Sequence, residues 1–291
     1  MPASENDKKE AIKRLDGLKN FQNFKQRATE LINNPAGIDQ DQFGVCGMIS
    51  TMYVMLIHHP GVFVDLLYAI FNDTAFPGFK EQMKKEGKGR LLYEREKEFN
   101  NKAAVNQYVK AGTKLDFVVS RTLGRFLRMA SSDQYKKQVD FMAQILGGDN
   151  EAKKRETQGD LALTEQGLML LLADVLQIES GSYIPPVDAA TLVGKVNEWH
   201  SQDSKKNPFV IAAVNKASEW ISGGKVPTGP FQKTGAADFS HWVAITGKST
   251  DRNGKYQIPV WTWSKNFSTE LDQRYTTGYL YSLVRGCAVL T

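Results

Sequence analysis

The chain has little cysteine. Only Cys46 and Cys287 occur among its 291 residues, too few for the disulfide framework on which small secreted proteins depend. The two cysteines and four histidines are scattered and lack the regular ligand spacing of a metal site. We therefore expect free thiols, no metal and no cofactor.

The chain also lacks a long uninterrupted hydrophobic run. Its most apolar stretch, residues 48 to 71, is broken by a His-His-Pro-Gly sequence at 58 to 61, and both remaining pieces are too short to span a bilayer. The first twenty residues alternate charges and lack the apolar core of a cleaved secretory signal. The sequence predicts a hairpin of core helices, no membrane span, and synthesis in the cytoplasm without a classical signal peptide.

Neither sign of charge dominates. Thirty-seven basic and 32 acidic residues give a net charge of +5, and the densest charged segment, 80 to 102, alternates lysine with glutamate. Mixed charge of this kind is typical of a solvated surface, whereas a nucleic-acid groove interleaves basic and aromatic residues. We expect no nucleic-acid binding.

The apolar content of 41% is sufficient for one large domain or two lobes. Helical spacing of apolar residues extends to about residue 200. We therefore expect a mainly helical lobe that covers residues 1–206. The expected helices cover 8–33, the stretch from Cys46 to 58, 62–71, 115–130, 133–146, 164–177 and 188–200.

The pattern changes after residue 206. Short β-branched and aromatic runs bounded by Gly, Pro, Asn and Asp predict an antiparallel sheet in a second lobe, 207–291. The runs are PFVIAAVNK, HWVAITGK, KYQIPVWTWSK and TGYLYSLVRGCAVL. Helices followed by strands indicate the α+β class.

One short stretch, DQDQFGVCGMIS at residues 39 to 50, places Cys46 between glycines at the start of a helix. Unpaired N–H groups and the helix dipole stabilise a thiolate at this position. The flanking Gly44 and Gly47 let a substrate carbonyl approach the backbone, and Gln40 offers an amide donor to an oxyanion beside the Cys46 N–H. A buried cysteine acting as a small hydrophobic residue is the alternative interpretation.

A thiol nucleophile needs a base, and histidine is the usual one. His58 and His59 lie three turns along the same helix, roughly 18 Å from its start, and cannot reach the thiol. His200 follows a polar helix end and is expected at the surface. His241 opens a strand directly after the Gly/Pro-rich loop 223–239, which favours it as the base; a strand-end histidine without a role is the alternative.

These residues resemble the papain-like cysteine peptidase superfamily. Gln40 stands six positions before Cys46, Gly44 two before and Gly47 directly after it, and His241 begins a strand. The resemblance implies that the cysteine and histidine face each other across a cleft between the lobes, with the glutamine supporting the oxyanion. It further implies a cysteine protease that cleaves an amide bond in a protein or peptide substrate.

The stretch from Cys46 to residue 74, together with the later HWVAITG and VWTW, is similar to papain-fold effectors and toxins that bacteria deliver into other cells. This narrower resemblance implies secretion by a specialised system into a target cell. It also implies a cognate immunity or inhibitor protein.

The chain departs from the superfamily at the third catalytic position, where an asparagine or aspartate usually orients the histidine. An Asp-Arg-Asn-Gly turn folds the strand of His241 back on itself, so that the orienting residue falls at Thr262 or, next in preference, Ser264, with Asn266 a distant third. The sequence leaves open a deamidase, a transglutaminase or a peptidoglycan amidase on the same fold. It also leaves open a catalytically inactive interaction protein.

Overall fold

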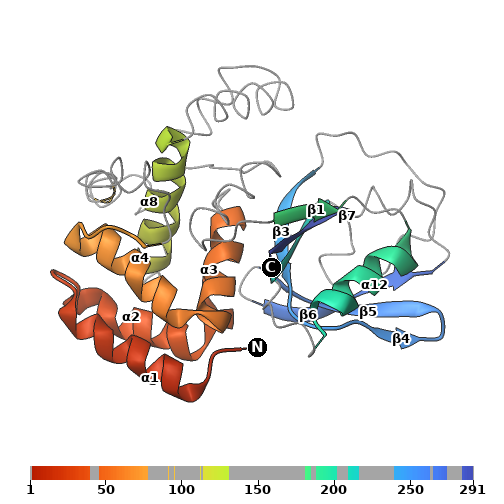
Figure 1. Cartoon of the computed structure of the whole chain (residues 1–291), viewed down its shortest axis with the longest axis horizontal. Helices are drawn as coiled ribbons and strands as arrows, with labels where there is room; N and C mark the ends of the chain where they lie inside the picture. The colour runs from red at the N-terminus through yellow and green to blue at the C-terminus, as the bar shows by residue number, and fades with distance from the viewer. Residues whose placement is uncertain are drawn as a thin grey trace. The chain divides into compact units, whose positions relative to one another are not determined.

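The computed structural model describes residues 2–39, 46–77, 91, 95, 112, 114–130, 181–184, 188–201, 209–215, 239–262, 265–273 and 284–290. The chain divides into two compact units, Met1–Gln177 and Ile178–Thr291, shown in Figure 1. The described elements of the first unit are helices, and those of the second are an antiparallel sheet with one helix. The predicted α+β class is therefore confirmed.

The division between the units lies earlier than the sequence boundary at 206/207. Strand β1 (Gly181–Ile184) and helix α12 (Ala189–Trp199) both precede residue 207 yet belong to the second unit. β1 pairs with the last strand of the sheet, which explains why this segment joins the sheet-containing unit.

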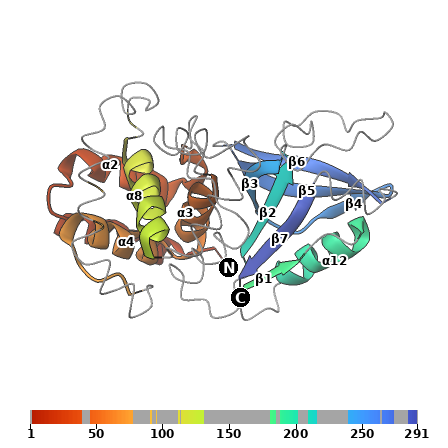
Figure 2. The same ribbon diagram turned by 90° about the horizontal axis from the view of Figure 1, so that it is seen from above.

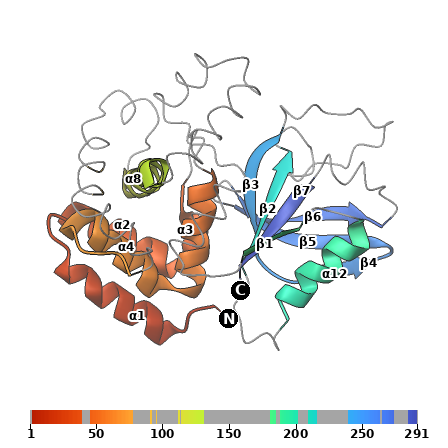
Figure 3. The ribbon, with the colours of Figure 1, turned by 45° about the horizontal axis from the view of Figure 1, so that its top comes forward.

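The first unit contains five described α-helices and two 3-10 turns, and Figure 3 views it nearly along α8. The elements are α1 (Glu5–Arg14), η1 (Leu15–Gly17), α2 (Gln22–Asn33), η2 (Pro35–Gly37), α3 (Cys46–His58), α4 (Pro60–Asn72) and α8 (Lys114–Ala130). The expected helix at 8–33 is thus two helices separated by η1, while the helix predicted at 115–130 is confirmed. The helices expected at 133–146 and 164–177 lie outside the described residues.

Local sequence signals explain several helix ends. Ser4 caps α1 reciprocally with Asp7: the Ser4 hydroxyl accepts from the Asp7 N–H at 3.2 Å, and the Asp7 carboxylate accepts from the Ser4 N–H at 2.8 Å. Pro60 opens α4, where its missing N–H costs nothing, and Asp73 ends α4 in a left-handed conformation. The hydrophobic stretch is therefore two helices, as predicted.

Helix α3 is buried on all sides. The spacing of Ile49, Met52, Tyr53 and Leu56 predicted an amphipathic helix, but every residue from 47 to 56 is buried. The cause is tertiary: α2, η2, α4 and α8 all contact α3. An apolar surface around the full circumference is typical of a helix at the centre of a helical unit.

The charged segment 80 to 102 is not entirely a solvated face. Leu91 and Arg95, the residues of this segment that the structure describes, are buried. The Arg95 guanidinium lies over the Phe71 ring, 5.0 Å from its centroid, and donates to the Phe71 carbonyl at 3.3 Å. The arginine therefore belongs to the core of the first unit.

The second unit is built on a seven-stranded antiparallel sheet, seen from above in Figure 2. Its strands are β1, β2 (Phe209–Asn215), β3 (Phe239–Ile245), β4 (Thr250–Arg252), β5 (Lys255–Thr262), β6 (Lys265–Asp272) and β7 (Val284–Leu290). The order is β1-β7-β2-β3-β5-β4, with β6 on the other edge of β5. All four predicted strands are confirmed, whereas β1, β4 and β6 were not predicted.

β3 is an interior strand. It pairs with β2 on one side and β5 on the other, and Trp242 through Ile245 are all buried. Burial of successive residues means that both faces of the strand are covered. Helix α12 contacts β2, and the side-chain oxygen of its Asn197 accepts from the Ser249 N–H at 2.7 Å.

A tight turn joins β4 to β5, as the sequence predicted. Asn253 and Gly254 have φ values of 58° and 78° between the paired residues Arg252 and Lys255, the pattern of a type I′ hairpin. The register is continuous through Pro259, so the proline introduces no shift into β5. The irregularity lies at 246–249, because Ile245 pairs with residue 260 and Thr250 with residue 257.

No helix in the part of the chain that the structure describes combines the length and the apolar character needed to cross a membrane.

Two glycines of the second unit should respond in opposite ways to alanine. Gly254→Ala should destabilise the unit by about 1–2 kcal/mol, because its left-handed φ disfavours a Cβ. Gly194→Ala, at an exposed position in α12 where a Cβ meets nothing within 4 Å, should stabilise it by roughly 0.5–1 kcal/mol.

Urea unfolding followed by tryptophan fluorescence measures both effects, because all five tryptophans fall within the second unit. Equal shifts of the unfolding midpoint in the same direction would contradict the assignment of the hairpin turn.

Candidate active site

Cys46 is the first residue of α3, as the sequence predicted. The N-terminus of a helix carries unpaired N–H groups and the positive end of the dipole, which favour a thiolate. Gln40 and Gly44 lie outside the described residues, as does the side chain of Cys46.

His241 lies in a strand, as predicted, but it is the third residue of β3 and not the first, and its backbone pairs with Val214 of β2. Its side chain lies outside the described residues, and so do Ser264 and nearly all of the 223–239 loop. Cys46 belongs to the first unit and His241 to the second, so each is described within its own unit.

Thr262, the preferred orienting residue, is the last residue of β5 and is only 1% exposed. Ala244 pairs with Trp261, and one further step of this register sets Thr262 beside Val243. Strand alternation then places positions 241 and 262 on one face as diagonal neighbours, not directly opposite. Such neighbours lie roughly 7–8 Å apart, still within reach of an aromatic side chain.

Trp261 lies on the other face of β5 from Thr262 by the same alternation, and it is 1% exposed. The indole therefore lies on the opposite side of the strand from the face that positions 241 and 262 share. Asn266, the third choice, pairs with Trp261 from β6 and is exposed.

The histidines other than His241 fit the sequence interpretation only in part. His58 is the last residue of α3, at the opposite end from Cys46, which confirms that it cannot act on the thiol. His200, expected at the surface, is half-buried as the C-terminal cap of α12. Burial lowers the pKa of His200 below its usual value, with Lys248 adding to the effect and a hydrogen bond with the Ile245 backbone opposing it.

An ion pair that the sequence analysis missed lies next to the segment leading to Cys46. Arg27 of α2 donates to both carboxylate oxygens of Asp116 in α8, from Nε at 2.9 Å and from Nη2 at 2.6 Å. Asp116 is 0% exposed and Arg27 17% at the side chain. The only sequence signal was an acid within the apolar run of the 115–130 helix.

The same two side chains also hold the backbone that follows α2. Arg27 Nη2 donates to the Gly37 carbonyl at 2.8 Å, and the Asp39 N–H donates to the Asp116 carboxylate at 2.8 Å. Burial raises the pKa of Asp116, against the lowering effect of Arg27 and of the Asp39 N–H. Burial acts to lower the pKa of Arg27, but the carboxylates of Asp116 and Glu30 together outweigh it, so that the pKa of Arg27 is raised.

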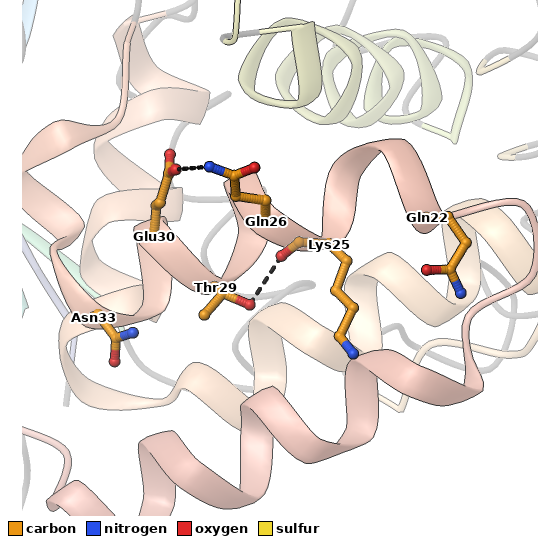
Figure 4. Close-up of a pocket in the computed structure, with 6 residues that line it drawn as sticks. All are labelled: Gln22, Lys25, Gln26, Thr29, Glu30 and Asn33. Atoms are coloured by element: carbon orange, nitrogen blue, oxygen red, sulfur yellow. Dashed lines mark hydrogen bonds between the residues drawn. The ribbon is translucent and has the colours of Figure 1, made fainter.

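A shallow depression of about 580 Å³ lies on the solvent side of α2 (Figure 4). Polar side chains line it: Gln22, Lys25, Gln26, Thr29, Glu30 and Asn33. Several of these groups are already paired within the helix, Gln26 with Glu30 at 3.0 Å and Thr29 with the Lys25 carbonyl at 2.8 Å. The depression therefore has the character of an ordinary helix surface.

Among the residues that the structure describes, no three His, Cys, Asp or Glu side chains gather where they could hold a metal ion.

In comparisons with known proteins, no family model matches the chain, and no curated protein or solved structure matches it. Any proposal for the chemistry of this chain therefore rests on its own residues. In the first unit these are a cysteine at the start of α3 and a buried ion pair that bonds to residues 37 and 39, and in the second unit a histidine in an interior strand.

His200 should make the second unit less stable as the pH falls. Because its folded-state pKa is lowered, the unfolded chain takes up the proton first, and stability is lost as the pH drops below the unfolded value of about 6.5. His200→Gln should remove the contribution of His200 to this pH dependence, so that less stability is lost between about pH 7 and 5.

Urea unfolding at several pH values, read by tryptophan fluorescence, measures the effect. His59→Gln is the matched control, because burial lowers the pKa of His59 too. It lies in the first unit, whereas all five tryptophans lie in the second, so it should leave this profile unchanged. A His200→Gln profile that parallels the unaltered protein would show that the ring titrates normally.

Proposed function

We propose that the chain is a papain-like thiol hydrolase that cleaves amide bonds, with Cys46 as nucleophile and His241 as base. The observation that carries the proposal is the position of Cys46 as the first residue of a helix whose next ten residues, 47 to 56, are buried. A thiol at this position gains the N–H groups and dipole that lower its pKa, while those ten residues are inaccessible.

The placement of His241 supports the same chemistry. A base must be held in one orientation, and β3 is an interior strand with both neighbouring strands paired and its following residues buried. In the proposed site Thr262, on the same face by register, orients the imidazole, with Ser264 as the second choice. A hydroxyl holds an imidazolium less strongly than a carboxylate, which predicts a modest rate.

The proposed reaction proceeds by acyl transfer. The Cys46 thiolate forms a C–S bond with the amide carbon, and the carbonyl electron pair moves to oxygen, where the Gln40 amide and the Cys46 N–H stabilise it. Collapse breaks the C–N bond as the His241 imidazolium gives its proton to the leaving amine. His241 then takes a proton from water, which attacks the thioester, breaks the C–S bond and releases the acid and the thiolate.

The proposed substrate is a protein or peptide, and delivery into a target cell by a specialised secretion system, with a cognate immunity or inhibitor protein, is part of the proposal. Deamidation, transamidation and cell-wall amide hydrolysis use the same thioester. They differ in which amide enters and in whether water or an amine accepts the acyl group.

The thiol of Cys46 should be activated. Alkylation by iodoacetamide, measured peptide by peptide by mass spectrometry across pH, should show Cys46 reacting below about pH 7, against about 8.5 for an ordinary thiol. His241→Ala should move its profile toward the ordinary value. Cys287, in β7, is the internal reference; equal and slow modification of both cysteines would favour an inert interaction protein.

Gln40 should act on the oxyanion and not on the thiol. Gln40→Ala should slow acylation of Cys46 by p-nitrophenyl acetate on the order of 10²-fold, because one oxyanion donor is lost. Its alkylation by iodoacetamide, a displacement at a saturated carbon without an oxyanion, should be unchanged. Cys46→Ala should abolish both reactions at this site, and equal slowing of both by Gln40→Ala would remove the glutamine from its proposed role.

A further inference from the structure

We infer that Arg27 and Asp116 are positioning residues that hold the backbone entering Gln40, and thereby set the oxyanion donor against Cys46. The inference rests on the proposed function, since it assigns these residues a role in that same site. Neither residue touches the reacting atoms; each acts through the segment from Gly37 to Asp39.

The geometry of the ion pair is unusual for a simple link between two helices. Arg27 and Asp116 lie 89 positions apart, on α2 and α8, and a brace between these helices needs only their two mutual hydrogen bonds. Here each side chain makes an additional bond to the same short segment, Arg27 to the Gly37 carbonyl and Asp116 to the Asp39 N–H. A donor and an acceptor of the segment are thus both fixed.

Burial makes this arrangement specific. Asp116 is 0% exposed, and a buried carboxylate is tolerated only where its oxygens are paired. Its partners are an arginine and a main-chain N–H, so moving Asp39 away would leave a carboxylate oxygen without one of its donors. The free energy of the buried pair therefore opposes displacement of the segment.

The restrained residue Asp39 directly precedes the proposed oxyanion donor in the sequence. Asp39 is bonded covalently to Gln40, and six residues later α3 begins at Cys46. The turn η2, which precedes Asp39, also contacts α3. The described residues on the two sides of the proposed donor are therefore both held: Asp39 by the ion pair, and the helix from residue 47 by its burial.

The test uses the double variant Arg27→Met/Asp116→Leu in the full chain. Replacing both partners leaves no unpaired buried charge, but it removes the acceptor for Asp39 and the donor for Gly37. The matched control is Arg14→Met/Asp65→Leu, an arginine–aspartate pair between α1 and α4 in which Arg14 also donates to a backbone carbonyl, that of Gly61 at 3.4 Å.

Two reagents separate positioning from general damage. Acylation of Cys46 by p-nitrophenyl acetate passes through an oxyanion, whereas alkylation by iodoacetamide does not. The double variant should lose acylation about as strongly as Gln40→Ala, on the order of 10²-fold, keep its alkylation profile, and lose little more when Gln40→Ala is added. The control should keep both rates.

Hydrogen exchange at the Asp39 amide gives a readout independent of the chemistry. Exchange should be faster in the double variant and unchanged in the control. Loss of Asp39 protection with wild-type acylation would overturn the inference and leave the proposed function intact. A Cys46 inert to both reagents in the unaltered protein would instead overturn the proposed function.

Asp116→Asn provides a second variant of nearly the same shape if the double variant does not fold. An amide has one oxygen where the carboxylate has two, so it cannot accept from the Asp39 N–H and from both Arg27 nitrogens. We expect slower acylation with alkylation unchanged. Acylation at the wild-type rate in Asp116→Asn, together with faster hydrogen exchange at the Asp39 amide, would also overturn the inference.

Discussion

The burial of α3 is the constraint on which the first unit depends. Residues 47 to 56 are inaccessible because α2, η2, α4 and α8 pack around them, so the side chains within this helix cannot meet a substrate. Its first residue is different, because a helix end exposes N–H groups that need partners. A cysteine at that end is stabilised as a thiolate. In the proposed mechanism it is the nucleophile.

The proposed site combines two kinds of support. Packing fixes α3 and the interior strand β3, which carry the proposed nucleophile and the proposed base. Charge fixes the connection: Arg27 and Asp116 reach from α2 and α8 to the backbone of residues 37 to 39. Apolar contacts are non-directional, whereas hydrogen bonds to a charged group select one geometry. In the proposed site, the segment that precedes the amide donor Gln40 is held by the second kind of support.

The sequence predicted those helices and strands that the local spacing of apolar residues determines. The start of α3 at Cys46, the 115–130 helix and the strand of His241 followed from apolar spacing and turn residues, because local pattern decides these elements. Strand β6 was missed because its sequence, KNFSTELD, is polar and its conformation depends on pairing with β5. The Arg27–Asp116 pair was missed because only tertiary packing joins residues 89 positions apart. The two-residue shift at 246–249 also depends on strand pairing: it brings Thr262 beside position 243, whereas a regular hairpin from the 252–255 turn would place Thr262 beside position 245.

The central claim is that Cys46 and His241 meet as a thiol and imidazole couple, and a bifunctional reagent measures this most directly. 1,3-Dibromoacetone first alkylates an activated thiol and then, through its second bromomethyl group, a nucleophile within reach of the short linker. Peptide mapping after reaction should recover the Cys46 and His241 peptides joined by one three-carbon bridge. A single-ended adduct on Cys46, or a bridge from Cys46 to any other residue, would contradict the account.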